Sequence, residues 1–275
     1  AGGLGIISAM SRDGSYLKEQ IDIARNLTDK PFGVNVMLMS PYTDEVAQLI
    51  ADEKVPVVTT GAGNPSKYME LWNNAGVKVI PVVASSALAK LVERLGACAV
   101  IAEGGESGGH IGDLTTMALV PQVVDAVKIP VIAAGGIADG RGIAAAFMLG
   151  AEAVQMGTHF VATEESIVHE NYKNAIIKAK DIDSRVTGRS TGHPVRALRN
   201  QMTKKYLDLE KNGASFEELE HLTLGGLRKA VVDGDVTNGS VMAGQSAAMV
   251  KEIMSCKDLI QKLVSETDAL IGGKG

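Results

Sequence analysis

The chain has 275 residues, of which 45% are apolar and 21% charged, and its formal net charge is −5. This acidic balance argues against nucleic acid or a membrane surface as a general partner, because both attract basic proteins. No apolar run approaches the ~20 residues that a membrane span requires, and no leader sequence opens the chain. The length suits a single (β/α)8 barrel, which typically has about 250 residues, and a small molecule is the expected partner.

Strand and helix patterns alternate along the first 160 residues. The predicted strands occupy residues 1–8, 31–39, 55–60, 77–83, 99–103, 130–134 and 153–160, and the predicted helices occupy residues 15–28, 43–54, 65–75, 85–95, 115–127 and 139–149. Such alternation favours a parallel sheet, and strands such as VIAA at 131–134 are apolar on both faces. Seven strands are one fewer than a closed barrel contains. The sequence therefore predicts an α/β fold, a (β/α)8 TIM barrel whose first strand lies upstream of Ala1.

A doubly wound open sheet is the alternative fold. Its dinucleotide-binding fingerprint, G-x-G-x-x-G, would connect a strand to the start of a helix. Here Gly3 and Gly5 are followed by Ile-Ile-Ser8, which ends a strand instead of opening a helix. The barrel therefore remains the favoured fold.

The alternating pattern stops between Asp181 and Val236. Four more helices are predicted within and after this segment, at residues 196–211, 215–230, 246–254 and 257–270. We predict that residues 1–180 and 236–275 form the barrel, and that residues 181–235 form a helical insertion or lid.

A glycine-rich loop with one histidine and two carboxylates follows the predicted strand 99–103, in the stretch EGGESGGHIG at 103–112. Glycines lack a Cβ atom and let the backbone approach a ligand closely. His110 can exchange a proton near neutral pH and is the candidate catalytic residue; the alternative is a structural histidine that bonds a loop carbonyl. The loop also matches the hydrolase pattern G-x-S-x-G, but Ser107 lacks the immediately following helix that a nucleophile elbow requires.

Two glycine motifs, AAGGI at 133–137 and QMGT at 155–158, belong to the seventh and eighth strands of the predicted barrel. Loops at these places often bind phosphate, and the backbone N–H groups of Gly136, Gly157 and Thr158 could cradle an anion. The alternative is that these glycines only make tight turns. Asn35 lies in the apolar strand 31–39, and its amide needs a partner, which a cofactor or a neighbouring carbonyl could supply.

Six cations and no acidic residue lie between positions 185 and 205, in a chain that is acidic elsewhere. They are Arg185, Arg189, Arg196, Arg199, Lys204 and Lys205. This run could attract a phosphorylated cofactor or an acidic protein, or it could be a solvated helix face.

The cysteines and the remaining histidines show no functional spacing. Cys98 and Cys256 are expected to be buried small side chains without a disulfide, which favours a reducing, cytoplasmic location. No two histidines or cysteines have the spacing of metal ligands, so we expect no metal site.

Together these motifs resemble the flavin-dependent barrel family that contains the nitronate monooxygenases and the type II enoyl-acyl-carrier-protein reductases of the FabK type. The resemblance covers essentially the whole chain, through EGGESGGHIG at 103–112, AAGGIADGR at 133–141 and VQMGT at 154–158. It implies that FMN is bound and that His110 is the catalytic histidine. The implied flavin contacts are Asn35, Glu103, Gly108, Gly109, Gly135, Gly136, Gln155, Met156, Gly157, Thr158, Met242, Ala243 and Gln245.

Three further stretches resemble the reductase branch, namely TTGAGNP at 59–65, LTTMALVP at 114–121 and TGRSTGHPVR at 187–196. A reductase of this kind would pass a hydride from NADPH or NADH to FMN, and from the flavin to a trans-2-enoyl thioester on acyl carrier protein, in bacterial type II fatty acid synthesis. His110 would donate a proton or orient the thioester. The basic run would suit the acidic carrier protein, and barrels of this kind often form homodimers.

Two departures from the family pattern and two competing functions accompany this resemblance. No turn of the family's Gln-Gly-Gly-Met type opens the chain, and His159 stands where relatives commonly carry arginine. A nitronate monooxygenase would use O₂ without a nicotinamide, and His110 would then be the base that deprotonates a nitroalkane. A catalytically idle flavin- or phosphate-binding barrel is the third hypothesis.

Overall fold

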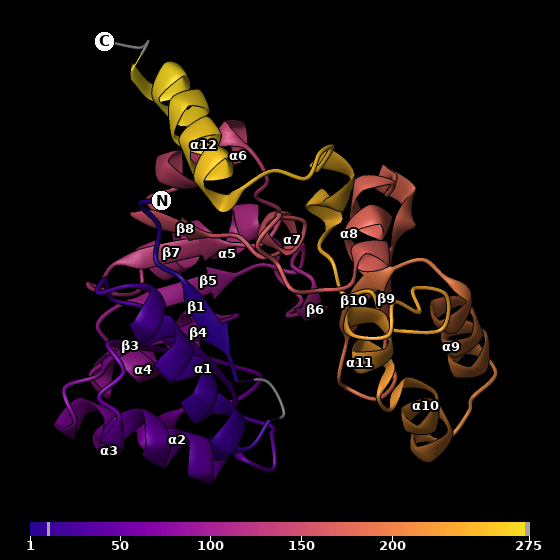
Figure 1. Cartoon of the computed structure of the whole chain (residues 1–275), viewed down its shortest axis with the longest axis horizontal. Helices are drawn as coiled ribbons and strands as arrows, with labels where there is room; N and C mark the ends of the chain where they lie inside the picture. The colour runs from indigo at the N-terminus through magenta and orange to yellow at the C-terminus, as the bar shows by residue number, and fades with distance from the viewer. Residues whose placement is uncertain (10–11, 273–275) are drawn as a thin grey trace.

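The computed structural model describes residues 1–9 and 12–272. Seven parallel strands form a curled sheet that makes a half-barrel (Figure 1). In sheet order they are β1 (Ile6–Ser8), β2 (Gly33–Met37), β3 (Val57–Gly61), β4 (Lys78–Val83), β5 (Val100–Glu103), β7 (Val131–Ala134) and β8 (Ala153–Gln155). The predicted barrel-like α/β class is confirmed, because the spatial order follows the chain order and lacks the reversal of a doubly wound sheet.

Alternate residues of each strand face opposite sides of this sheet. Val34, Val58 and Val79 face outward and are at most 1% exposed, where they join the helices through side chains such as Ile50 and Trp72. The residues between them, including Asn35 and Thr59, therefore point to the inner side. The inner side at the carboxyl ends of the strands is where polar side chains can meet a ligand.

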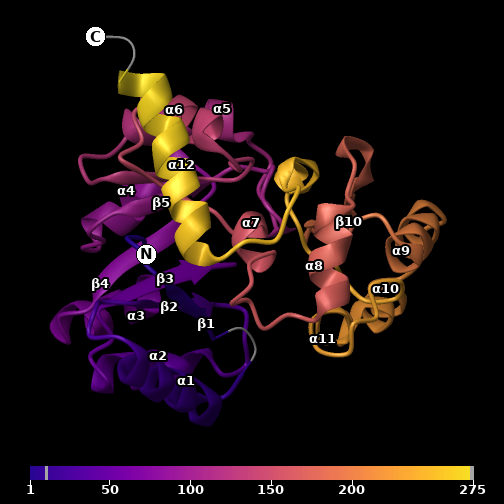
Figure 2. The ribbon, with the colours of Figure 1, turned by 45° about the horizontal axis from the view of Figure 1, so that its top comes forward.

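Helices cover the outer face of the sheet (Figure 2). They are α1 (Gly14–Leu27), α2 (Thr43–Asp52), α3 (Ser66–Asn74), α4 (Ser86–Arg94), α5 (Thr116–Val124), α6 (Gly140–Met148) and the final helix α12 (Cys256–Ile271). Helix α12 packs on α6, and the backbone N–H of Gly140 donates to Glu266 Oε2 at 3.0 Å. No helix within the described ranges is long and apolar enough to cross a membrane.

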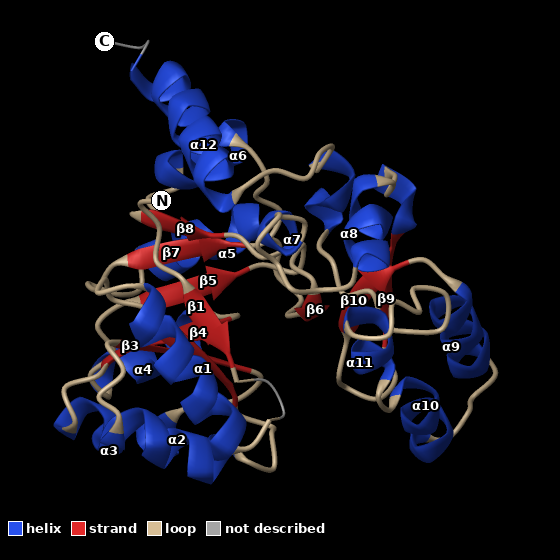
Figure 3. Ribbon diagram, in the orientation of Figure 1, coloured by secondary structure: helices blue, strands red, loops and turns tan. Residues whose placement is uncertain are grey.

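A second lobe lies beside the half-barrel (Figure 3). It contains α8 (Glu170–Ile177), α9 (Gln201–Lys211), α10 (Phe216–Thr223), α11 (Gly226–Val231) and the hairpin of β9 (Ser184–Thr187) and β10 (Val195–Leu198). Tyr172, Ile176 and Leu198 belong to one of its apolar clusters, and Met202, Tyr206 and Leu219 form another. The short strand β6 (Gly109–His110) lies between the lobes and pairs with β10.

Several predicted element boundaries are wrong. The predicted helix 196–211 is strand β10 followed by helix α9, because Val195 to Leu198 pair with β6 and β9. The predicted strand 153–160 ends at Gln155, and helix α7 (Thr158–Val161) follows. Gly225, at a φ of 70°, divides the predicted helix 215–230 into α10 and α11, and the predicted helix 246–254 is the 3₁₀ helix η2 (Gln245–Met249). Another 3₁₀ turn, η1 (Asp181–Asp183), precedes β9.

The cysteine prediction was half right. Both thiols are free within the described part of the chain. Cys98 is exposed and Cys256 is half-buried, because each precedes or begins its element instead of lying within a packed face.

Candidate active site

The loop after β5 is folded back on itself by its own polar groups. Glu106 Oε1 and Oε2 accept the backbone N–H of Thr116 at 3.0 and 2.9 Å, and Oε2 also accepts the Thr116 hydroxyl. A carboxylate at the start of a helix satisfies free N–H groups and complements the helix dipole. Glu106 therefore fixes the loop to the first turn of α5. No helix follows Ser107 directly, since β6 comes next, so the loop is not a nucleophile elbow.

The backbone of His110 is held by the β9–β10 hairpin. His110 is in register with Val195 and Gly109 with Arg196 in an antiparallel pair, and Ile111 N–H donates to the Pro194 carbonyl at 3.1 Å. Burial lowers the pKa of His110, and the neighbouring His193 lowers it further. The imidazole is therefore predominantly neutral at pH 7 and keeps one N–H donor.

Glu103 ends β5 on the inner side of the half-barrel. It is in register with Ala134, which is in register with Gln155 on β8, so all three point to the same side. Burial raises the pKa of Glu103 to about 7. Ser107 slightly opposes this shift, but its buried Oγ lies outside hydrogen-bond geometry and has no partner among the described residues.

The predicted phosphate and flavin segments come together at this end of the sheet. Gly244 N–H donates to Thr158 Oγ1 at 2.9 Å, and Gln245 N–H donates to the Glu106 carbonyl at 2.9 Å. A Cβ on Gly108 would lie only 2.7 Å from the Ala243 carbonyl carbon, so glycine is required for this contact. Three segments that are distant in sequence therefore meet at one place, namely residues 106–109, 155–158 and 242–245.

Two glycines of this site present free backbone donors. Gly136 and Gly157 are exposed, and within residues 1–9 and 12–272 neither N–H donates a hydrogen bond to the protein. A Cβ on Gly157 would meet open space, and Gly136 has a φ of 75°, which favours glycine. Unpaired, exposed N–H groups of this kind are suited to an anion.

The other predicted flavin contacts have different surroundings. Asn35 Oδ1 accepts the hydroxyl of Thr59 at 2.8 Å, so a neighbouring side chain provides one partner for its amide. Met242 lies beside Gly109, since a Cβ there would be 3.7 Å from the Met242 sulfur. The carbonyl of Gly104 and the hydroxyl of Thr116 crowd Gly135, whose φ is 96°. Met156 packs against the core beside Gln155.

His159 has a structural role. It is 9% exposed, and its Nδ1 lies 2.8 Å from the Ala138 carbonyl. This contact binds α7 to the turn before α6.

Arg196 of the basic run does not lie on a solvated helix face, because it belongs to strand β10 and is buried. Its side chain is 7% exposed and donates to the Gly105 carbonyl and to Ser184 Oγ. Arg189 pairs with Asp113 at 3.6 Å, and Arg199 pairs with Asp183 at 2.9 Å. The sequence motif at 187–196 includes Arg196. The burial of this residue could not be read from the motif, because its hydrogen-bond partner Gly105 lies 91 residues away in the sequence.

Comparisons with known proteins agree with this geometry. The family model described as nitronate monooxygenase matches residues 40–266. The chain belongs to the nitronate monooxygenase family. It is therefore related to flavin-dependent oxidoreductases and monooxygenases, and it is an enzyme with oxidoreductase activity.

Three relatives show the range of this nitronate monooxygenase family. The structure of FabK from Thermotoga maritima is 52% identical, with a TM-score of 0.96, and the match covers 99% of this chain and 87% of that chain. A 5-hydroxy-7a-methyl-1-oxo-octahydro-1H-indene-4-carboxyl-CoA dehydrogenase of Rhodococcus jostii is 32% identical over 100% of this chain and 88% of its own. A probable nitronate monooxygenase of Staphylococcus saprophyticus is 31% identical over 98% and 89%.

Proposed function

We propose that this protein is an FMN-dependent enoyl-acyl-carrier-protein reductase that uses NADH or NADPH and serves fatty acid synthesis. The observation that carries the proposal is the 52% identity to FabK of T. maritima over 99% of this chain. The dehydrogenase relative of R. jostii is named for a carboxyl-CoA compound. A compound that carries a CoA thioester therefore occurs in the name of a relative whose match covers the whole of this chain.

The site described above fits FMN. The free N–H groups of Gly136 and Gly157 and the N-terminus of α7 suit its phosphate, with Thr158 beside them. Asn35 and Glu103 provide polar groups on the inner side of the sheet for the rest of the cofactor. When bound, FMN supplies hydride transfer between a nicotinamide and an organic substrate.

His110 would act on the thioester substrate. In the overall reaction the β-carbon of the enoyl thioester gains a hydride, the α-carbon gains a proton, and NAD(P)H becomes NAD(P)⁺. Negative charge develops on the thioester oxygen when the hydride arrives. Because burial keeps the pKa of His110 low, its neutral imidazole can donate an N–H hydrogen bond to that oxygen. This state favours an orienting and charge-stabilising role over direct transfer of the proton.

The second lobe offers a basic surface for the carrier protein. Arg185, Arg199 and Lys204 line a cavity of about 520 Å³ between β9 and α9, together with one carboxylate, that of Asp208. An acidic protein would be attracted to these cations. We therefore assign carrier docking to these residues and leave Arg196, which is buried, out of it.

The decisive experiment is anaerobic reduction of the FMN-loaded protein with NADH or NADPH, followed by addition of a crotonyl thioester. We expect the flavin absorbance near ~450 nm to bleach and then to recover. His110→Ala should bleach normally and recover at least ~100-fold more slowly. Flavin that is reduced by neither nicotinamide, or that stays reduced with the thioester, would rule out the reductase.

Nitronate monooxygenase is the second candidate, because the family model and the S. saprophyticus relative carry that name. A neutral His110 would also suit the base of that reaction. Oxygen consumption with an alkyl nitronate, in the absence of any nicotinamide, would select this function. Oxygen consumption that requires NAD(P)H would not support nitronate monooxygenase activity.

A further inference from the structure

The guanidinium of Arg196 is fixed at three points inside the protein. Its Nε and Nη2 donate to the Gly105 carbonyl at 3.0 and 2.7 Å, and its Nη1 donates to Ser184 Oγ at 2.7 Å. No carboxylate lies within ion-pair distance among the residues that the structure describes. A buried cation bonded only to neutral oxygens is a costly way to stabilise a fold. This cost suggests that Arg196 has a task in the site.

Arg196 reaches both ends of the segment that leads to His110. Its side chain holds the carbonyl of Gly105, and its backbone is in register with Gly109 across the β6–β10 pair. Gly109 has a φ of 80°, a left-handed conformation that favours glycine, and it is buried in the β6–β10 pair. One residue of the hairpin therefore contacts both ends of the segment 105–109, immediately before the histidine.

We infer that Arg196 is a positioning residue for His110: by holding Gly105 and Gly109 together, it fixes where the imidazole lies in the site. The inference rests on the proposed function, in which His110 acts on the substrate. The planar fork of arginine can donate two parallel bonds to one carbonyl and a third to Ser184. A lysine ammonium keeps the charge but cannot reproduce this arrangement, so the loop would relax.

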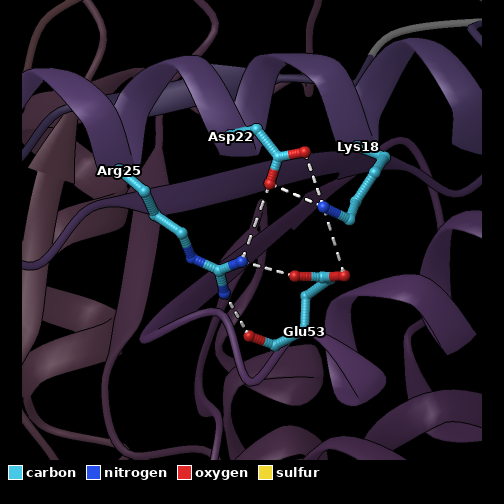
Figure 4. Close-up of polar contacts among 4 residues, drawn as sticks. All are labelled: Lys18, Asp22, Arg25 and Glu53. Atoms are coloured by element: carbon cyan, nitrogen blue, oxygen red, sulfur yellow. Dashed lines mark hydrogen bonds and ion pairs between the residues drawn. The ribbon is translucent and has the colours of Figure 1, made fainter.

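Arg25 supplies a matched control in a different part of the molecule. Its guanidinium also donates to a backbone carbonyl, that of Glu53, and to the Glu53 carboxylate (Figure 4). This contact joins α1 to the end of α2, on the outer side of the half-barrel, and Lys18 and Asp22 complete the cluster. Arg25→Lys therefore changes the same kind of group without touching the loop of His110.

The first test is an NMR titration of His110 in the full-length protein. In the wild type the pKa of His110 should be depressed, and Arg196→Lys should move it back toward the ordinary value of ~6.5. Arg25→Lys should leave the titration unchanged. Ser184→Ala removes one acceptor of Arg196 and should give a smaller shift in the same direction, which covers the case in which Arg196→Lys does not fold. A His110 titration that coincides with the wild type in both Arg196→Lys and Ser184→Ala overturns the inference.

The second test separates the two half-reactions of the FMN-loaded protein. Arg196→Lys should slow flavin reoxidation by the crotonyl thioester at least ~10-fold, with a shifted pH profile, and should change reduction by NAD(P)H less than ~2-fold. Equal slowing of both half-reactions without a pH shift would show a merely structural role and overturn the inference. A wild-type protein that is not reoxidised by the thioester overturns the proposed function instead, and the NMR titration then decides the role of Arg196 alone.

Discussion

The carboxylate of Glu106 binds the backbone N–H and the hydroxyl of Thr116, and so joins the loop after β5 to the first turn of α5. Glu106→Ala should lower the free energy of unfolding by about 1–2 kcal/mol, because it removes a helix cap. Urea unfolding at pH 7 measures this loss. Glu106→Gln keeps one acceptor oxygen and should lose less. Unfolding midpoints that are identical for the wild type and the alanine variant would contradict the capping role.

Gly108→Ala should break the contact between the loop of His110 and the segment 242–245. A Cβ there would lie 2.7–2.8 Å from backbone atoms of Ala243 and Gly244, and backbone cannot move aside as a flexible side chain can. We expect at least ~10-fold weaker FMN binding, measured by fluorescence titration. Gly5→Ala, where a Cβ meets nothing, is the control. Unchanged FMN affinity in Gly108→Ala would show that this contact does not shape the cofactor site.

Glu103 should make the stability of the cofactor-free protein depend on pH. Its pKa is about 7 in the folded state against 4.5 for the free group, so the folded protein binds more protons between these values. Stability should therefore fall as the pH rises from about 5 to 8, by up to about 3 kcal/mol.

Glu103→Gln should remove this dependence, because the amide does not titrate. All other residues are the same in both proteins, so their contribution cancels in the difference. Urea unfolding of both proteins at pH 5 and pH 8 measures how the difference in their free energies of unfolding changes with pH. A difference between variant and wild type that is constant across this range would show that Glu103 titrates normally.

Charge reversal on the second lobe should weaken carrier binding selectively. Arg199→Glu with Lys204→Glu should raise the KM for a carrier-bound enoyl substrate at least ~5-fold and leave the KM for crotonyl-CoA unchanged. Lys262→Glu makes the same kind of charge change on α12, where it faces Glu252, and is the control. Equal increases in KM for both substrates would contradict the proposal that these residues bind the carrier protein.

The parallel strands and their helices could be predicted from sequence because their patterns are local. Apolar stretches such as 131–134, bounded by glycine and proline, fall within one or two residues of the strands in the structure. The start of a helix also depends on a local cap residue, such as Asp139, which accepts the N–H groups of Arg141 and Gly142 at the beginning of α6. The glycine motifs at 133–137 and 155–158 are local patterns of the same kind, and both lie at the carboxyl ends of their strands.

The β6–β10 pair could not be predicted, because neither partner looks like a strand alone. Gly109 and His110 lie in a glycine-rich loop, and the sequence VRAL at 195–198 reads as the start of a helix. The two segments are extended only because they pair with each other, and the paired residues His110 and Val195 are 85 residues apart in the sequence. Gly105, the hydrogen-bond partner of Arg196, is similarly distant in sequence. The charge of Arg196 alone therefore indicated an exposed side chain, whereas the side chain is buried. The boundaries of the predicted insertion at 181–235, the homodimer and the cytoplasmic location stay predictions.

The pairing of β6 with β10 also constrains how this enzyme can diversify. The loop that carries His110 and the hairpin that carries Arg196 exchange backbone hydrogen bonds and a buried guanidinium contact, so neither can change its length or course alone. Exchange of the hairpin between relatives should preserve activity only when residues 104–112 are transferred with it. The two segments, separated along the gene, are therefore expected to be inherited as one unit.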